Sequence, residues 1–85
     1  MQMNCIRYTT ETKVFITNGQ TDTNCNSVIF VNTGQDVVNV DNLNLQPGQK
    51  LEISGNRDEV LVKVYVFAFA TFVQPSLTVI FKRYL

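Results

Sequence analysis

The side chains that most often carry out catalysis are scarce in this sequence. Its 85 residues include no histidine, which removes the commonest general base and metal ligand. Cys5 and Cys25 lack the CxxC spacing of a zinc or redox site. We expect two reduced, mostly buried thiols, with a disulfide across neighbouring strands as the alternative. The sequence therefore predicts that the protein is not an enzyme and uses neither a cofactor nor a metal ion.

One segment is rich in oxygen ligands. Residues 36–44, DVVNVDNLN, combine carboxylates and amides of the kind that bind calcium. The spacing matches no EF-hand, and two acidic groups separated by a strand make a weak set of ligands. We interpret Asp41, Asn42 and Asn44 as turn residues that satisfy backbone groups.

The composition argues against charged partners. Seven basic and seven acidic residues give a net charge of zero, and the charged fraction of 16% lies below the roughly 25% of ordinary domains. Long-range attraction to nucleic acid or to an anionic membrane is therefore not expected. No secretion signal is visible in residues 1–12, and the apolar run at residues 64–70 is too short to span a membrane as a helix. Asn, Thr and Gln make up 24 residues, a weakly self-repelling composition that suits close packing among many copies.

The spacing of apolar residues and turn residues predicts strands and almost no helix. Strands are expected near Asn4–Thr9, Thr12–Thr17, Ser27–Asn32, Val37–Asp41, Lys50–Ser54, Glu59–Thr71 and Ser76–Tyr84. Turns are expected at Asn18–Gly19, Thr33–Asp36, Pro47–Gly48 and Ser54–Asn56, with a solvent or contact loop at Gln20–Asn26. The predicted fold is a single all-β domain over residues 1–85, an antiparallel β-sandwich of about seven strands with immunoglobulin-like or jelly-roll topology.

The longest predicted strand is apolar on both faces. Valine and alanine at positions 64, 66, 68 and 70 alternate with Tyr65, Phe67 and Phe69. Because a small two-layer domain covers only one face of each sheet, one of these faces needs a second covering. We predict that the small residues point inward and that the three aromatic rings bind a partner. A loop or terminal segment folding over the rings within the monomer is the alternative, and base stacking beside Lys63 is a weaker one.

The text from Ser27 to Gly55, SVIFVNTGQDVVNVDNLNLQPGQKLEISG, has a distinctive order: an apolar strand, an N-T-G turn, a Val-rich strand, then L-x-P-G-Q before the next strand. It resembles the middle of small immunoglobulin-like or jelly-roll sandwiches, including auxiliary (decoration) capsid proteins and other small head and tail proteins of tailed bacteriophages. The resemblance covers about a third of the chain. It carries over no functional residues.

The resemblance implies a structural virion component, made in the host cytoplasm, that binds and stabilises the capsid lattice. Its partners would be the major capsid protein or other virion proteins, and many copies or a homo-oligomer are expected. The alternatives are a minor tail or neck protein and a sugar- or host-binding β-sandwich module. Neither nucleic acid nor membrane is an expected partner.

Overall fold

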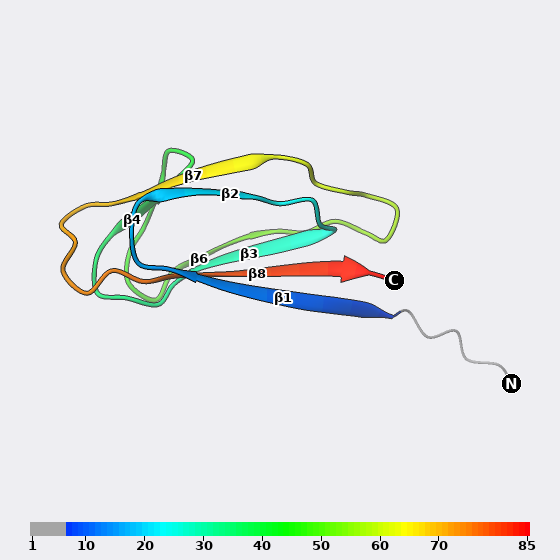
Figure 1. Cartoon of the computed structure of the whole chain (residues 1–85), viewed down its shortest axis with the longest axis horizontal. Helices are drawn as coiled ribbons and strands as arrows, with labels where there is room; N and C mark the ends of the chain where they lie inside the picture. The colour runs from blue at the N-terminus through cyan, green and yellow to red at the C-terminus, as the bar shows by residue number, and fades with distance from the viewer. Residues whose placement is uncertain (1–6) are drawn as a thin grey trace, which may run out of the picture.

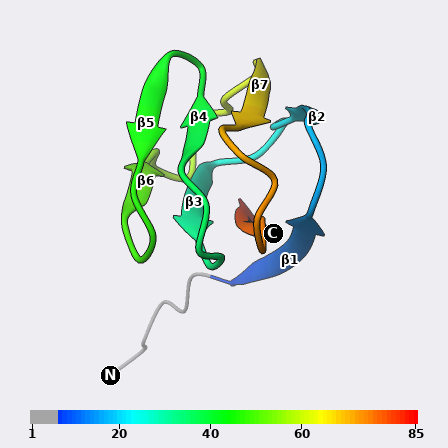
Figure 2. The ribbon, with the colours of Figure 1, turned by 90° about the vertical axis from the view of Figure 1, so that its left-hand side faces the viewer.

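A computed structural model describes residues 7–85, which form two four-stranded antiparallel sheets lying face to face (Figure 1). The strands are β1 (Tyr8–Phe15), β2 (Gly19–Asp22), β3 (Ser27–Asn32), β4 (Val38–Val40), β5 (Leu43–Leu45), β6 (Lys50–Ile53), β7 (Val64–Phe69) and β8 (Leu77–Tyr84). The first sheet has the strand order β1-β8-β3-β6, and the second has the order β2-β7-β4-β5. Figure 2 shows the two layers from one end.

This strand order is that of a jelly roll. The chain passes back and forth between the two sheets, and only β4 and β5 are both consecutive in sequence and paired with each other. Eight strands in two four-stranded sheets with these crossings form the double Greek key of jelly-roll proteins. The predicted all-β sandwich is therefore confirmed, with jelly-roll topology and eight strands.

Three strands were merged or missed by the sequence prediction, and a fourth, β7, is shorter than the expected strand Glu59–Thr71. Residues 8–15 form one continuous strand where two were expected, and residues 4–6 of the first expected strand lie outside the described residues. β2 lies inside the segment predicted as a loop, and β5 was not predicted. All three are edge strands and bury few side chains. The apolar alternation that identifies a strand is therefore weak in them.

The predicted turns are confirmed only in part. The Pro47–Gly48 turn is confirmed: Gly48 has a φ of 84°, and the N–H of Gln49 donates to the carbonyl of Gln46 at 2.9 Å. All four predicted turns, Pro47–Gly48 included, connect strands of opposite sheets and close no hairpin, and neither Asn18 nor Gly19 has a positive φ.

The β4–β5 hairpin turns at Asp41–Asn42, where φ values of 50° and 72° match the two left-handed positions of a type I′ turn. The predicted turn is thus confirmed, but the side chain that bonds to its backbone is that of Asn39, which was not among the predicted turn residues. The backbone N–H of Asn42 donates to the side-chain oxygen of Asn39, and the Asn39 amide donates to Asn44.

The core lies between the sheets and is built from the inward side chains of both. The first sheet contributes Val28, Phe30, Leu77, Val79 and Phe81, and the second contributes Val38, Val40, Leu45, Tyr65, Phe67 and Phe69. Two aromatic pairs bridge the layers, Phe15 with Phe67 and Phe30 with Tyr65, at ring-centroid distances of 4.7 and 4.9 Å. Large rings suit this position because facing sheets lie about 10 Å apart.

Buried polar side chains hold the connections between the sheets. The Asn32 amide nitrogen donates to the carbonyls of Asp36 and Leu45 at 2.7 and 2.9 Å, and its oxygen accepts from the N–H of Gly34. The Asp36 carboxylate accepts hydrogen bonds from the backbone and hydroxyl of Thr71. Every buried side-chain polar atom within residues 7–85 has a partner, as a small sandwich with many crossings requires.

Candidate functional site

The structure places the three aromatic residues predicted to bind a partner in the core of the monomer. Tyr65, Phe67 and Phe69 are 5%, 1% and 4% exposed. The prediction that these rings point outward is wrong, and in the folded monomer they are covered. The physical reason is volume: β7 is an inner strand of its sheet, and valine and alanine side chains on its inward face would leave the space between the sheets unfilled.

The outward face of β7 and of the segment before it is apolar as well. Val60, Val62, Val64 and Val66 occupy alternate positions and are 60%, 78%, 44% and 56% exposed. We call these four residues the valine stripe. Of the residues between them, Leu61 and Tyr65 pack in or against the core, whereas Lys63 is exposed. The expected second apolar face therefore exists, but the two faces are exchanged relative to the prediction.

Uncharged polar residues and one carboxylate border the valine stripe. Gln20 and Asp22 of β2 lie opposite Val66 and Val64 in the sheet register. On the other side of β7, Asn39 of β4 lies opposite Ala68, the next outward-facing residue of β7 after Val66. A surface of this kind, apolar along one stretch of chain and weakly charged at its margins, is typical of a protein–protein contact.

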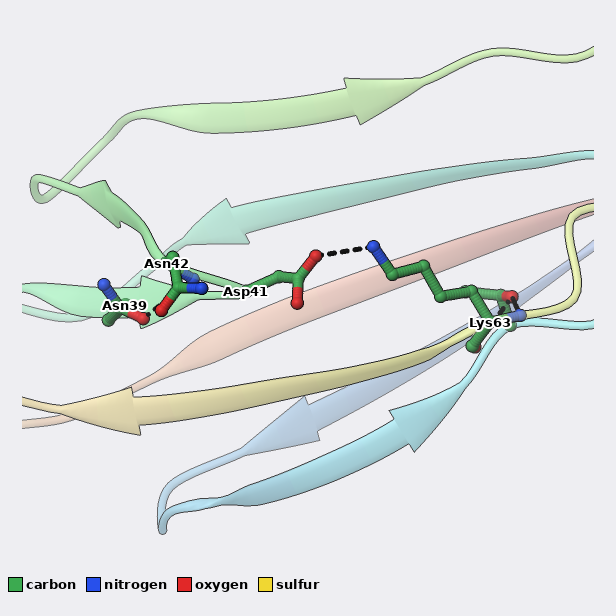
Figure 3. A network of polar contacts seen from close by, with 5 residues as sticks. Asn39, Asp41, Asn42 and Lys63 are labelled. Atoms are coloured by element: carbon green, nitrogen blue, oxygen red, sulfur yellow. Dashed lines mark hydrogen bonds and ion pairs between the residues drawn. The ribbon is translucent and has the colours of Figure 1, made fainter.

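Lys63 and Asp41, the charged residues nearest to β4, form an ion pair with each other. The Lys63 ammonium donates to the Asp41 carboxylate at 2.6 Å, linking the segment before β7 to the β4–β5 turn (Figure 3). The hydrogen bond to Asp41 raises the pKa of Lys63, against the opposing effect of burial, and the ammonium also lies 4.7 Å from the Tyr65 ring centroid. Lys63 is thus committed to contacts within the chain. Asp22 forms no ion pair with any other residue in the 7–85 range.

A second surface feature is a cavity of about 360 Å³ on the outer face of the first sheet. The half-buried side chains Ile29 and Ile80 contribute apolar surface to it, and Glu52, Lys82 and Tyr84 contribute polar groups. Its volume falls at the lower end of the range for small-molecule sites. Sequence patterns could not reveal this cavity, because its residues come from four strands brought together only by the sheet register.

The Lys82 ammonium lies next to this cavity between two tyrosine rings. It is 4.3 Å from the ring centroid of Tyr8 and 4.9 Å from that of Tyr84, and the two rings pack edge to face. Such placement holds the cation by attraction to the aromatic faces. The cavity therefore has a fixed cationic group on one side and a carboxylate, Glu52, among its other lining residues.

The cysteine in the described chain is a buried thiol. Cys25 is 1% exposed, and burial raises its pKa, against the opposing effect of Arg83, so the neutral thiol is favoured. The prediction that Cys25 is buried is confirmed, and Cys25 forms no disulfide bond within residues 7–85. Cys5 lies outside the described residues. No cluster of three or more potential metal ligands occurs among residues 7–85.

Comparison with known proteins identifies no relative of this chain. No protein-family model matches the chain, and no curated protein and no solved structure matches it significantly. Within the part of the chain that the structure describes, no helix is long and apolar enough to cross a membrane.

Proposed function

We propose that the chain is a structural virion component, an auxiliary capsid protein of a tailed phage, that binds a neighbouring protein subunit through the valine stripe. The single observation that carries this proposal is the exposure of four alternate valines along β7 and the segment before it in a folded monomer. Contiguous exposed apolar surface on a small protein is typical of an interaction site. Burial of these side chains supplies binding energy at about 25 cal/mol per Å² of apolar area, less the cost of association.

The jelly-roll topology supports the choice of a virion partner. Two-sheet jelly rolls of eight strands are found in viral capsid proteins and in lectins, and this is an argument from the fold alone. The low charged fraction and the many Asn, Thr and Gln residues favour dense packing beside other subunits. Because Asp22 borders the stripe without an ion pair in the described chain, the complementary surface on the major capsid protein should be apolar with a basic margin.

The test is binding of the purified chain to particles assembled without it. Val62→Asp should reduce binding by tenfold or more, because a charge would be placed in the centre of an apolar contact. Val73→Asp is the matched control, since Val73 is 64% exposed but lies outside the valine stripe. Both variants should keep wild-type thermal stability, because exposed substitutions change it by no more than about 0.5 kcal/mol. Equal binding by the two variants would refute the role of the stripe.

The location of the chain has its own measurement. Quantitative mass spectrometry of purified particles should find copies in proportion to the capsid lattice, and cross-links from residues near the stripe should reach the major capsid protein. A few copies per particle would indicate the minor tail or neck protein. Absence from particles would refute the virion proposal.

A sugar-binding module is the second candidate, and the cavity beside Lys82 is the observation that favours it. Saccharides combine apolar ring faces with hydroxyl groups, which suits a site with isoleucine, tyrosine, lysine and glutamate side chains. Glycan-array binding that is lost in Tyr84→Ala, with wild-type binding kept in Val62→Asp, would support this candidate. The absence of any glycan signal at high micromolar concentration would remove it.

A further inference from the structure

The first sheet ends in an unusually long, regular edge strand. β1 pairs with β8 over all eight residues from Tyr8 to Phe15, without interruption. Its other edge pairs with no strand in the part of the chain that the structure describes (Figure 2). The other three edge strands, β2, β5 and β6, have four, three and four residues. An edge of this length is a template for pairing with another strand.

The phase of the β1–β8 ladder shows which backbone groups of β1 are available. The N–H of Leu85 donates to the carbonyl of Arg7 at 2.8 Å, so the backbone groups of Arg7 point towards β8. In an antiparallel ladder this direction alternates, so the odd-numbered residues of β1 use their N–H and C=O groups towards β8. The even-numbered residues, at positions 8, 10, 12 and 14, therefore present theirs to the free edge.

Charge selects one way for two copies of β1 to pair across a two-fold axis. Pairing that joins even-numbered residues over most of β1 can be centred on residue 10, 11, 12 or 13. A centre at Thr10 places Lys13 opposite Arg7 of the second copy, which is unfavourable. A centre at Glu11 or at Lys13 places that charged residue opposite its own copy, which is unfavourable. A centre at Thr12 places Glu11 opposite Lys13 of the second copy, and by symmetry Lys13 opposite Glu11.

The same register covers exposed apolar side chains. Tyr8, Val14 and Ile16 are 54%, 60% and 63% exposed. With the axis at Thr12, Tyr8 lies opposite Ile16 of the second copy, and Val14 lies opposite Thr10. Pairs between aromatic and β-branched residues are favourable across antiparallel strands. Charge and apolar contacts thus agree on one register.

We propose that β1 mediates homodimerisation by antiparallel pairing with β1 of a second copy, with the two-fold axis at Thr12. The two first sheets then form one continuous eight-stranded sheet across the dimer. The occupant of this edge is a second copy of the chain, because β1 carries both members of the charge pair in self-complementary order. The inference does not depend on the virion proposal, since the purified chain alone should form the dimer.

Sedimentation velocity of the full chain over a range of concentrations tests the proposal. The wild type should show a reversible monomer–dimer equilibrium. Thr12→Pro removes an N–H that faces the free edge and not β8, so the variant should be a folded monomer with the wild-type circular dichroism spectrum. Thr12→Val keeps that N–H and is the matched control, which should dimerise like the wild type.

Charge reversal then tests the register. Glu11→Lys and Lys13→Glu each place like charges opposite each other twice per dimer, and each should weaken dimerisation by tenfold or more. The double variant Glu11→Lys/Lys13→Glu restores opposite charges and should recover dimerisation to within a few fold of wild type. The single variants also disturb contacts within the monomer, such as the 3.0 Å ion pair of Glu11 with Arg83, so thermal unfolding of each variant is measured alongside.

Three results would overturn the proposal. A wild-type chain that stays monomeric would mean that Glu11 and Lys13 protect the edge from pairing. Dimerisation of Thr12→Pro at the wild-type concentration would place the contact elsewhere. Failure of the double charge reversal to recover dimerisation lost in folded single variants would exclude the axis at Thr12.

Discussion

The Asp36 carboxylate accepts a 2.7 Å hydrogen bond from the backbone N–H of Phe72. Asp36 lies in the connection between β3 and β4, and Phe72 lies in the connection between β7 and β8, so one side chain joins two crossings at the same end of the sandwich. Phe72 has a φ of 61°, a conformation that bulky residues rarely adopt. The hydrogen bond from its N–H to Asp36 helps to hold this strained turn in place.

Replacing this carboxylate should destabilise the fold. Burial by itself raises the pKa of Asp36, but the hydrogen bonds from Thr71, Phe72 and Val37 outweigh it and hold the pKa below its ordinary value of 3.8. Asp36→Asn supplies one acceptor oxygen instead of two, and its amide NH₂ group would face the backbone N–H groups that now donate to the carboxylate. We expect its melting temperature at pH 7 to fall by several degrees, whereas Asp58→Asn, at an exposed position, should change little.

The pH dependence of this effect has a fixed direction. Because the pKa of Asp36 is lower in the folded chain than in the unfolded chain, the ionised carboxylate stabilises the fold at pH values above 3.8. This contribution is lost as the pH falls through the lower folded-state pKa. The difference in denaturant midpoint between wild type and Asp36→Asn should therefore be constant near neutral pH and shrink below pH 3.8. A difference that grows on acidification would contradict the assignment.

Truncation of Phe67 should destabilise the fold far more than truncation of Val66. Phe67 is 1% exposed and packs against Phe15, so Phe67→Ala should lower the free energy of unfolding by about 3 to 5 kcal/mol. Val66→Ala, one residue away on the exposed face, should change it by no more than about 0.5 kcal/mol. Urea denaturation followed by circular dichroism measures both. A stable Phe67→Ala variant would mean that the ring is not part of the core.

Asn32 should be far more important for stability than the exposed Asn44. Asn32→Ala leaves the carbonyls of Asp36 and Leu45 without their donor in a buried site, at a cost of at least about 2 kcal/mol. Asn44→Ala removes only an exposed hydrogen bond with Asn39 and should be nearly neutral. Comparable losses in the two variants would show that the buried network is not the source of the stability.

Gly34 is required by the close approach of two chain segments. A Cβ atom at this position would lie 2.5 Å from both the Gln74 carbonyl oxygen and the Ser76 nitrogen, which are backbone atoms that cannot rotate away. Gly34→Ala should destabilise the fold by about 1 to 3 kcal/mol. Gly19→Ala is the matched control, because its Cβ would meet only the Phe67 ring at 3.5 Å. Thermal melting of the two variants in parallel would distinguish a local clash from a general effect of losing glycine.

The sequence predicted the strands that bury one clear face and missed those that do not. β3 was located to the residue, and the positions of β6 and β8 were close to the prediction, because short runs rich in Val, Ile, Leu and Phe, bounded by turn residues, mark them. The expected strand Glu59–Thr71 contains β7 but extends beyond it at both ends, and alternation cannot say which of two apolar faces points inward. The answer depends on the volume between the sheets, which is a property of the assembled fold.

The candidate binding surfaces were predictable only in part. A second apolar face was expected from the sequence, and the structure has one, made of valines instead of aromatic rings. The cavity beside Lys82 and the free edge of β1 depend on which strands become neighbours. Turn residues such as Thr33–Asp36 mark a change of direction, but they do not encode whether the chain returns in the same sheet or crosses to the other one.

The central position of β8 in the first sheet has a consequence for folding during synthesis. β8 is the last of the eight strands to leave the ribosome, yet it separates β1 from β3 and pairs with both. Until Leu77–Tyr84 has emerged, β1 has no strand to pair with, and one wall of the core is missing. Sheets dominated by such distant pairings fold slowly, on a scale of about milliseconds to seconds. The nascent chain should therefore keep the inward apolar residues of β3 uncovered on one side until β8 pairs with it.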